Sequence, residues 1–134
     1  FGTSHLIQKL VLRALDSGEY MKNLAKAQCR YQVKANVMND SLSDYFPDLV
    51  KWEKPQGGLN FWAELPRSMN TGLKSKLFQE ALNQDVLYVP GSLCYVEDAS
   101  RRKPSYEMRL SFGAASEKDI RKGIRSLGNV LKCK

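Results

Sequence analysis

The stretch LNFWAEL at residues 59–65 indicates how this chain folds, because its apolar and polar residues alternate and two of them are aromatic. Such alternation is typical of a β-strand with one buried face. A shorter apolar segment at residues 49–53 precedes it, and Pro55-Gln56-Gly57-Gly58 lies between the two. The pattern predicts a β-hairpin. The Gly57-Gly58 pair either forms its turn or lets another backbone or a ligand come close.

Further helices and strands are expected on both sides of this hairpin. Apolar residues at helical spacing predict four helices, at residues 6–15, from a cap at Ser17 to Pro47, at 73–84, and from a capping box at Ser116 to 131. Short apolar runs predict three more strands, at residues 86–89, 93–96 and 108–113. Because long strand-helix-strand repeats are absent, we predict an α+β fold. It would be a two-layer domain whose small, mainly antiparallel sheet is covered by helices on one face.

Composition limits the classes of function. The 134 residues suffice for one compact domain, and no run approaches the roughly 20 apolar residues that span a bilayer. The first residues lack the pattern of a secretion signal. Three widely spaced cysteines, Cys29, Cys94 and Cys133, match neither a zinc motif nor a disulfide scaffold and favour a reduced, cytoplasmic protein. With His5 as the only histidine, a Ser-His or Cys-His catalytic site or a multi-histidine metal site is hard to build.

The formal net charge of +7 raises the question of an acidic partner. The basic residues are scattered along the chain, and the densest run, Arg101-Arg102-Lys103, lies beside Pro104 in what reads as a solvated loop. Nucleic-acid binding needs clustered cations that displace counterions from phosphates. We therefore expect neither a nucleic acid nor a membrane as partner of this domain.

Arg109 is the residue that most needs a functional explanation. It lies in the predicted strand Glu107-Met108-Arg109-Leu110-Ser111-Phe112. If the three apolar residues of this strand face the core, Arg109 and Ser111 share the opposite face. The residues alone leave two interpretations open. One is an exposed or salt-bridged arginine on a half-solvated sheet, and the other is a planar pair of donors directed at a carboxylate.

Four segments extend this picture over most of the chain. They are PQGGLNFWAELP at residues 55–66, VLYVPGS at 86–92, MRLSF at 108–112 and IRKGIRSL at 120–127. In this order they resemble the C-terminal small domain of the pyridoxal-phosphate-dependent aminotransferases of fold type I, the class I and II group. Gly18-Glu19-Tyr20 and the long helix after it are similar to the family's connection between its large and small domains. The resemblance therefore covers nearly the whole chain.

The resemblance implies roles for two residues. Arg109 matches the family's arginine that binds the α-carboxylate of the amino-acid substrate. Tyr95 is a weaker candidate for contact with the substrate side chain, and core packing is its alternative. In the same comparison, residues 1–18 correspond to an interdomain helix and hinge, and residues 19–134 to the small domain.

The resemblance also implies that the catalytic centre is elsewhere. The family's Schiff-base lysine and its ligands for the cofactor belong to the large domain, which this chain does not contain. We expect that domain upstream of Phe1, since the chain does not begin with Met. No catalytic, cofactor-binding or metal-binding residue is assigned in the chain, and we expect the isolated chain to be inactive. The full-length protein is expected to bind pyridoxal 5′-phosphate, to transfer an amino group between an amino acid and a 2-oxo acid, and to form a homodimer.

Two other functions stay open. Transcriptional regulators that join a winged-helix DNA-binding domain to an aminotransferase-like effector domain share the same segments. An independent binding or structural domain that retains the fold is the other alternative. The sequence upstream of Phe1 separates the three, because a helix-turn-helix there favours the regulator and a cofactor-binding region without one favours the enzyme.

Overall fold

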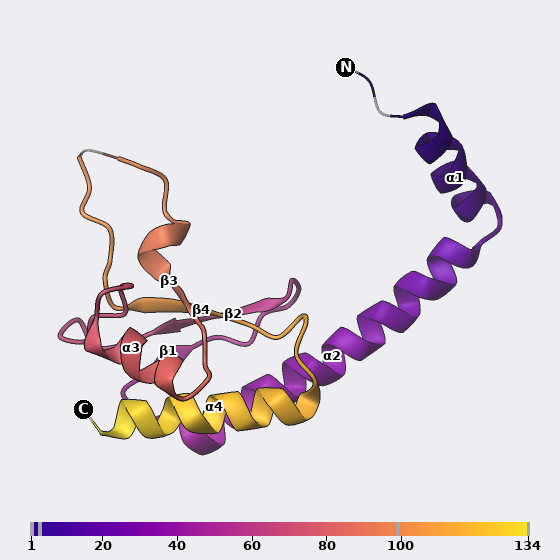
Figure 1. Cartoon of the computed structure of the whole chain (residues 1–134). Coiled ribbons are helices and arrows are strands. Elements are labelled where there is room, and N and C mark those ends of the chain that lie inside the picture. The colour runs from indigo at the N-terminus through magenta and orange to yellow at the C-terminus, as the bar shows by residue number, and fades with distance from the viewer. Residues whose placement is uncertain (1, 3, 99, 134) are drawn as a thin grey trace. The chain divides into compact units, whose positions relative to one another are not determined.

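The structure is a computed structural model that describes residue 2, residues 4–98 and residues 100–133 (Figure 1). Its contacts divide the chain into two compact units, Phe1–Val33 and Lys34–Lys134, and the boundary falls inside the long helix α2. The elements in chain order are α1 (His5–Asp16), α2 (Glu19–Tyr45), β1 (Lys51–Trp52), β2 (Asn60–Glu64), α3 (Lys76–Asn83), β3 (Val89–Pro90), η1 (Gly91–Cys94), β4 (Glu107–Ser111) and α4 (Glu117–Lys132). The division of the parent protein into residues 1–18 and 19–134 stays a prediction.

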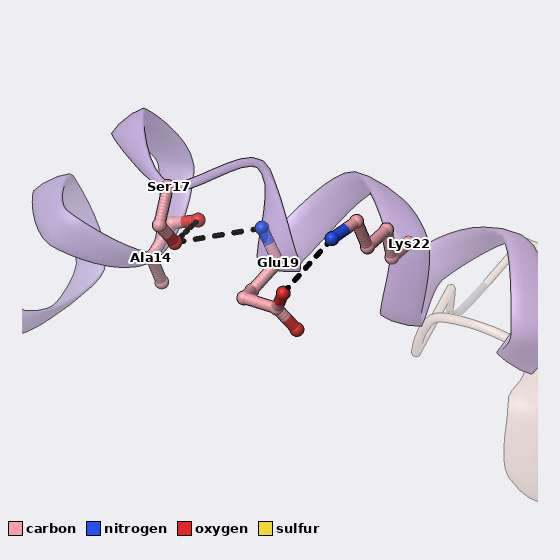
Figure 2. Close-up of polar contacts among 4 residues, drawn as sticks. All are labelled: Ala14, Ser17, Glu19 and Lys22. Atoms are coloured by element: carbon pink, nitrogen blue, oxygen red, sulfur yellow. Dashed lines mark hydrogen bonds and ion pairs between the residues drawn. The ribbon is translucent and has the colours of Figure 1, made fainter.

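The first unit consists of α1 and the N-terminal part of α2, with a short break between them. The hydroxyl of Ser17 donates to the carbonyl oxygen of Ala14 at 3.1 Å and accepts from the amide of Glu19 at 3.5 Å (Figure 2). Gly18 has a φ of 74°, a left-handed conformation that ends a helix with little strain only in glycine. Lys22 pairs with Glu19 at 3.2 Å. Both predicted helices are confirmed, but the predicted N-terminal cap at Ser17 is wrong. Ser17 is the C-terminal cap of α1, and Gly18 directly precedes α2, with its carbonyl oxygen accepting from the amide of Lys22.

The second unit is built on a four-stranded antiparallel sheet with the strand order β1-β2-β4-β3. Lys51 of β1 lies opposite Glu64 of β2, and Trp52 lies opposite Ala63, so the predicted hairpin is confirmed. Its connection contains Gly58 with a φ of 80°, as a turn requires. β4 comes from far along the chain and pairs with both β2 and β3. This makes β4 an inner strand of the sheet.

Helices cover one face of this sheet. Alternation buries Phe61 and Ala63 in β2, and Met108 and Leu110 in β4. α3, α4 and the C-terminal part of α2 lie on the side of these residues (Figure 1). They contribute Val37, Met38, Leu42, Leu77, Phe78, Ala81, Ile120, Ile124, Leu127 and Leu131 to the same core. The predicted α+β class, with helices on one face of a small antiparallel sheet, is confirmed.

The predicted strand at residues 93–96 is wrong. Gly91–Cys94 form the 3₁₀ helix η1 instead. Leu93 is 60% exposed and Val96 is 88% exposed. An apolar run forms a strand where it has a partner strand and a face to bury, and these residues have neither.

The strand predicted at residues 86–89 is displaced and becomes β3, Val89–Pro90. Asp85 adopts a φ of 58°, and the amide of Val86 then donates to the carbonyl oxygen of Ala81 at 2.9 Å. Residues 84–86 therefore close the C-terminal end of α3 and are not available to the sheet.

A single serine stabilises the start of α4. The hydroxyl of Ser116 accepts from the amide of Asp119 at 3.2 Å and donates to its carboxylate at 2.6 Å. The predicted capping box is confirmed, because the Asp119 carboxylate interacts with both the hydroxyl and the backbone amide of Ser116. The hydroxyl also lowers the pKa of Asp119.

We expect Ser116→Ala to lower the free energy of unfolding by about 1 kcal/mol, the usual effect of losing a helix cap. Urea unfolding followed by circular dichroism measures this change. Ser43→Ala is the matched control, because the exposed Ser43 hydroxyl binds only the carbonyl oxygen of Asn39 inside α2. If both variants unfolded at the same urea concentration, the cap would not stabilise the domain.

Candidate functional site

The face of the sheet opposite the helices carries polar side chains, and we call it the open face. Directly opposed residues of an antiparallel pair point to the same side, with their Cβ atoms about 5 Å apart. The open face consists of three such pairs from β2 and β4: Asn60 with Ser111, Trp62 with Arg109, and Glu64 with Glu107. The prediction that Arg109 and Ser111 share the face away from the core is confirmed.

Arg109 lies at the centre of the open face. Trp62 of β2 is opposite it on one side and Val89 of β3 on the other. The residue is half-buried, and its Nε has no hydrogen-bond partner in the part of the chain that the structure describes. None of the ion pairs among the described residues involves it. A buried donor without a partner is unfavourable, and a carboxylate that accepts two parallel N–H bonds would satisfy it.

Tyr95, the second residue predicted for the site, lies beside the same group. Its hydroxyl donates to Oε2 of Glu107 at 2.7 Å. Its ring meets Trp62 edge to face, with the centroids 6.2 Å apart and the planes at 74°. Tyr95 is 41% exposed in this domain. Trp62 therefore lies between the two predicted residues, since it contacts Tyr95 and is paired with Arg109.

The position of Glu107 depends on a close approach by Gly91. A Cβ at Gly91 would lie 2.6 Å from the Cβ of Glu107 and 3.0 Å from its carbonyl oxygen, so glycine is required there. On β4 itself, the Glu107 carbonyl oxygen accepts from the hydroxyl of Thr71 at 2.6 Å. Only 8% of Glu107 is exposed. This acid is held firmly at the end of the open face nearest η1.

The sequence interpretation missed Trp62 and Glu107 as site residues. Glu107 precedes Arg109 by two positions, so alternation alone places both on one face. For Trp62, alternation shows that it points away from Phe61, but only the register of β2 against β4 brings it to Arg109.

The hydrogen bond to Glu107, with a smaller contribution from burial, raises the pKa of Tyr95 from 10.0 to about 12. We therefore expect the phenolate of Tyr95 to form near pH 12. Below pH 10, Tyr95 is protonated in both the folded and the unfolded chain, so its stabilising contribution is fully present. As the pH rises through about 12, that contribution is lost.

The difference in phenolate absorbance between wild type and Tyr95→Phe during a pH titration isolates this residue. The subtraction is needed because burial also raises the pKa of Tyr88 to about 12. In Glu107→Gln, the transition of Tyr95 is expected to move back toward pH 10. A transition near pH 10 in the wild type would contradict the hydrogen bond.

The described residues contain neither a metal-binding cluster nor a helix that could span a membrane. No group of three His, Cys, Asp or Glu there is arranged to hold a metal ion. The three cysteines are free and exposed. No helix in the described part is long and apolar enough to cross a membrane.

Sequence comparison relates the chain to proteins about three times its length. No protein-family model matches it. It is 32% identical over 130 residues both to an uncharacterised aminotransferase of Saccharolobus solfataricus and to aromatic-amino-acid aminotransferase 1 of Thermococcus litoralis. Each alignment covers 97% of this chain, but 31% and 30% of these relatives. An HTH-type transcriptional regulator of Bacillus subtilis is 29% identical over 132 residues, which are 98% of this chain and 26% of the regulator.

Comparison with solved structures also matches the chain to part of longer aminotransferases. A multiple-substrate aminotransferase from Thermococcus profundus superposes with a TM-score of 0.79 at 31% identity, over 90% of this chain and 28% of that one. The α-aminoadipate aminotransferase LysN from Thermus thermophilus, solved with N-(5′-phosphopyridoxyl)-L-leucine, gives a TM-score of 0.77 at 31% identity. That match covers 94% of this chain and 30% of LysN.

Proposed function

Since the chain belongs to the aminotransferases of fold type I, as their C-terminal small domain, we propose that it binds the substrate carboxylate in a pyridoxal-phosphate-dependent aminotransferase. The parent protein would transfer an amino group between an amino acid and a 2-oxo acid. The observation that carries this proposal is the half-buried Arg109, whose Nε has no partner among the described residues.

The chemistry of the open face supports a carboxylate as the ligand of Arg109. A guanidinium presents two parallel N–H groups that match the two oxygens of a carboxylate and fix its orientation. Trp62 is paired with Arg109 in the sheet and contacts Tyr95, which supports both aromatic rings as neighbours of the ligand. Apolar walls exclude water and strengthen a charge-assisted hydrogen bond.

The open face does not by itself fit the cofactor. Pyridoxal phosphate needs an amine for its aldehyde and several donors for its phosphate, whereas Arg109 shares this face with the carboxylates of Glu64 and Glu107. When bound, the cofactor supplies the electron sink for amino transfer. We infer that the large domain of the parent protein binds it, that the isolated chain is inactive, and that the parent is a cytoplasmic homodimer.

The test is an assay of the full-length protein. After reconstitution with pyridoxal phosphate, we expect the absorbance of the bound cofactor and the formation of 2-oxo acids from amino acids. Cofactor binding without amino transfer to any 2-oxo acid would contradict the enzymatic function.

An aminotransferase-like effector domain of a transcriptional regulator is the second candidate. Its support is the identity of 29% to the Bacillus subtilis regulator over 98% of this chain. A helix-turn-helix encoded upstream, together with sequence-specific DNA binding by the full-length protein, would favour it. The higher identity to aminotransferases favours the enzyme.

A further inference from the structure

Two acidic residues, Glu64 and Glu107, share the open face with Arg109, and their charge affects which substrate side chains can bind there. The inference that follows rests on the proposed function, in which Arg109 is neutralised by the substrate α-carboxylate. Two carboxylates, Glu107 and Glu64, then remain opposite each other on the open face. Like charges in directly opposed positions are unfavourable unless a cation compensates them.

The environment differs for the two acids. Glu64 is opposite Lys51 of β1, which brings a cation to its side. The Glu107 carboxylate accepts from the neutral hydroxyl of Tyr95, whereas Gly91 lies against the Cβ and the backbone of Glu107. Tyr95 binds Oε2, and this is the one hydrogen bond of the Glu107 carboxylate among the described residues. Glu107 is therefore the acid whose second carboxylate oxygen, Oε1, can accept from a bound cation.

The distance between Glu107 and Arg109 suits one class of substrate. Two residues apart on a strand, their side chains are about 7 Å apart on the same face. An amino acid whose carboxylate is held by Arg109 reaches Glu107 with a side chain of several methylene groups. The rings of Tyr95 and Trp62, 6.2 Å apart, lie along this path and also attract cations through their faces.

We propose that Glu107 selects substrates by charge and favours amino acids whose side chain ends in a cation, such as an amine. Tyr95 holds the carboxylate in place from the end of η1. The opposite direction along β4 leads to Ser111, which is exposed and carries no charge. The Glu107 end of the open face is therefore the end that distinguishes side chains.

The experiment compares kcat/KM of the full-length protein for L-lysine and L-norleucine, which share a four-carbon side chain and differ in the terminal amine. We expect the ratio of lysine to norleucine to fall about tenfold in Glu107→Gln, because one charge-assisted hydrogen bond is lost. Glu97→Gln is the matched control. It removes the same charge from an exposed loop, where Glu97 pairs with Lys103 at 2.6 Å, and is expected to leave the ratio unchanged.

A second measurement needs no variant. In the wild type, kcat/KM is expected to decrease in the order L-lysine, L-norleucine, L-2-aminoadipate, and the reverse order would overturn the proposal. An equal loss for lysine and norleucine in Glu107→Gln would also overturn it, since Glu107 would then only support the fold. Absence of amino transfer from every amino acid tested is a different result. It would overturn the proposed function and this inference with it.

Discussion

Replacement of Arg109 by alanine in the full-length protein is expected to lower kcat/KM for amino-acid substrates by about 100-fold or more. Loss of one partner from a desolvated charge pair costs roughly 2–5 kcal/mol, and each 1.4 kcal/mol corresponds to a factor of ten. Arg109→Lys is expected to recover only part of the loss, because an ammonium lacks the two parallel donors of a guanidinium.

Stability measurements distinguish this functional role from a structural one. The Nε of Arg109 has no partner among the described residues, so its removal breaks no hydrogen bond of that atom within the domain. We expect the free energy of unfolding of Arg109→Ala to stay within about 1 kcal/mol of the wild type. Arg121→Ala, at an exposed position of α4, is the control for loss of one positive charge. An unchanged kcat/KM in Arg109→Ala would contradict the proposal that Arg109 binds the substrate carboxylate.

The second large effect concerns the contact between α4 and the end of α2. A Cβ at Gly128 would collide with the carbonyl oxygen of Tyr45 and lie 2.9 Å from its carbonyl carbon. Because the close atoms belong to the backbone of Tyr45, a flexible side chain cannot move away to make room for the Cβ. Gly128→Ala is therefore expected to lower the free energy of unfolding by about 2 kcal/mol. The movement also disturbs Arg125, whose guanidinium lies 4.9 Å from the Tyr45 ring centroid and donates to the Tyr45 hydroxyl at 2.7 Å.

Gly123 provides a matched control on the same helix. A Cβ there would meet nothing within 4 Å. Gly123→Ala is therefore expected to raise the free energy of unfolding by up to about 1 kcal/mol, the helix-propensity difference between the two residues. Denaturant unfolding of both variants measures whether the free energy of unfolding decreases in Gly128→Ala and increases in Gly123→Ala. Equal shifts in one direction would contradict the close packing at Gly128.

Periodicity predicted the elements that bury a regular face. The helix at residues 116–131 was recognisable because Ser116 caps it and four apolar residues recur along one side. The hairpin was recognisable because β2 alternates. Residues 93–96 also include apolar side chains, yet these are exposed and the segment forms no strand. Local sequence does not state whether a partner strand is present, which is why this prediction failed.

The site was predictable to a similar extent. Alternation placed Arg109 on the face away from the core, and the structure agrees. The neighbours of Arg109 could not be derived in this way. The contact of Tyr95 with Trp62 joins residues 33 positions apart in sequence and depends on the strand register and on the path of η1. A pattern within one segment carries no information on either.

The absence of a side chain at Gly91 has a consequence for substitutions at position 107. Because Gly91 leaves room for any Cβ at position 107, a mutation at 107 changes the chemistry of the open face without moving β3 against β4. A mutation at position 91 would instead displace the strands. If Glu107 selects substrates as proposed, glycine at 91 is the fixed requirement, and single substitutions at position 107 are expected to change the substrate preference.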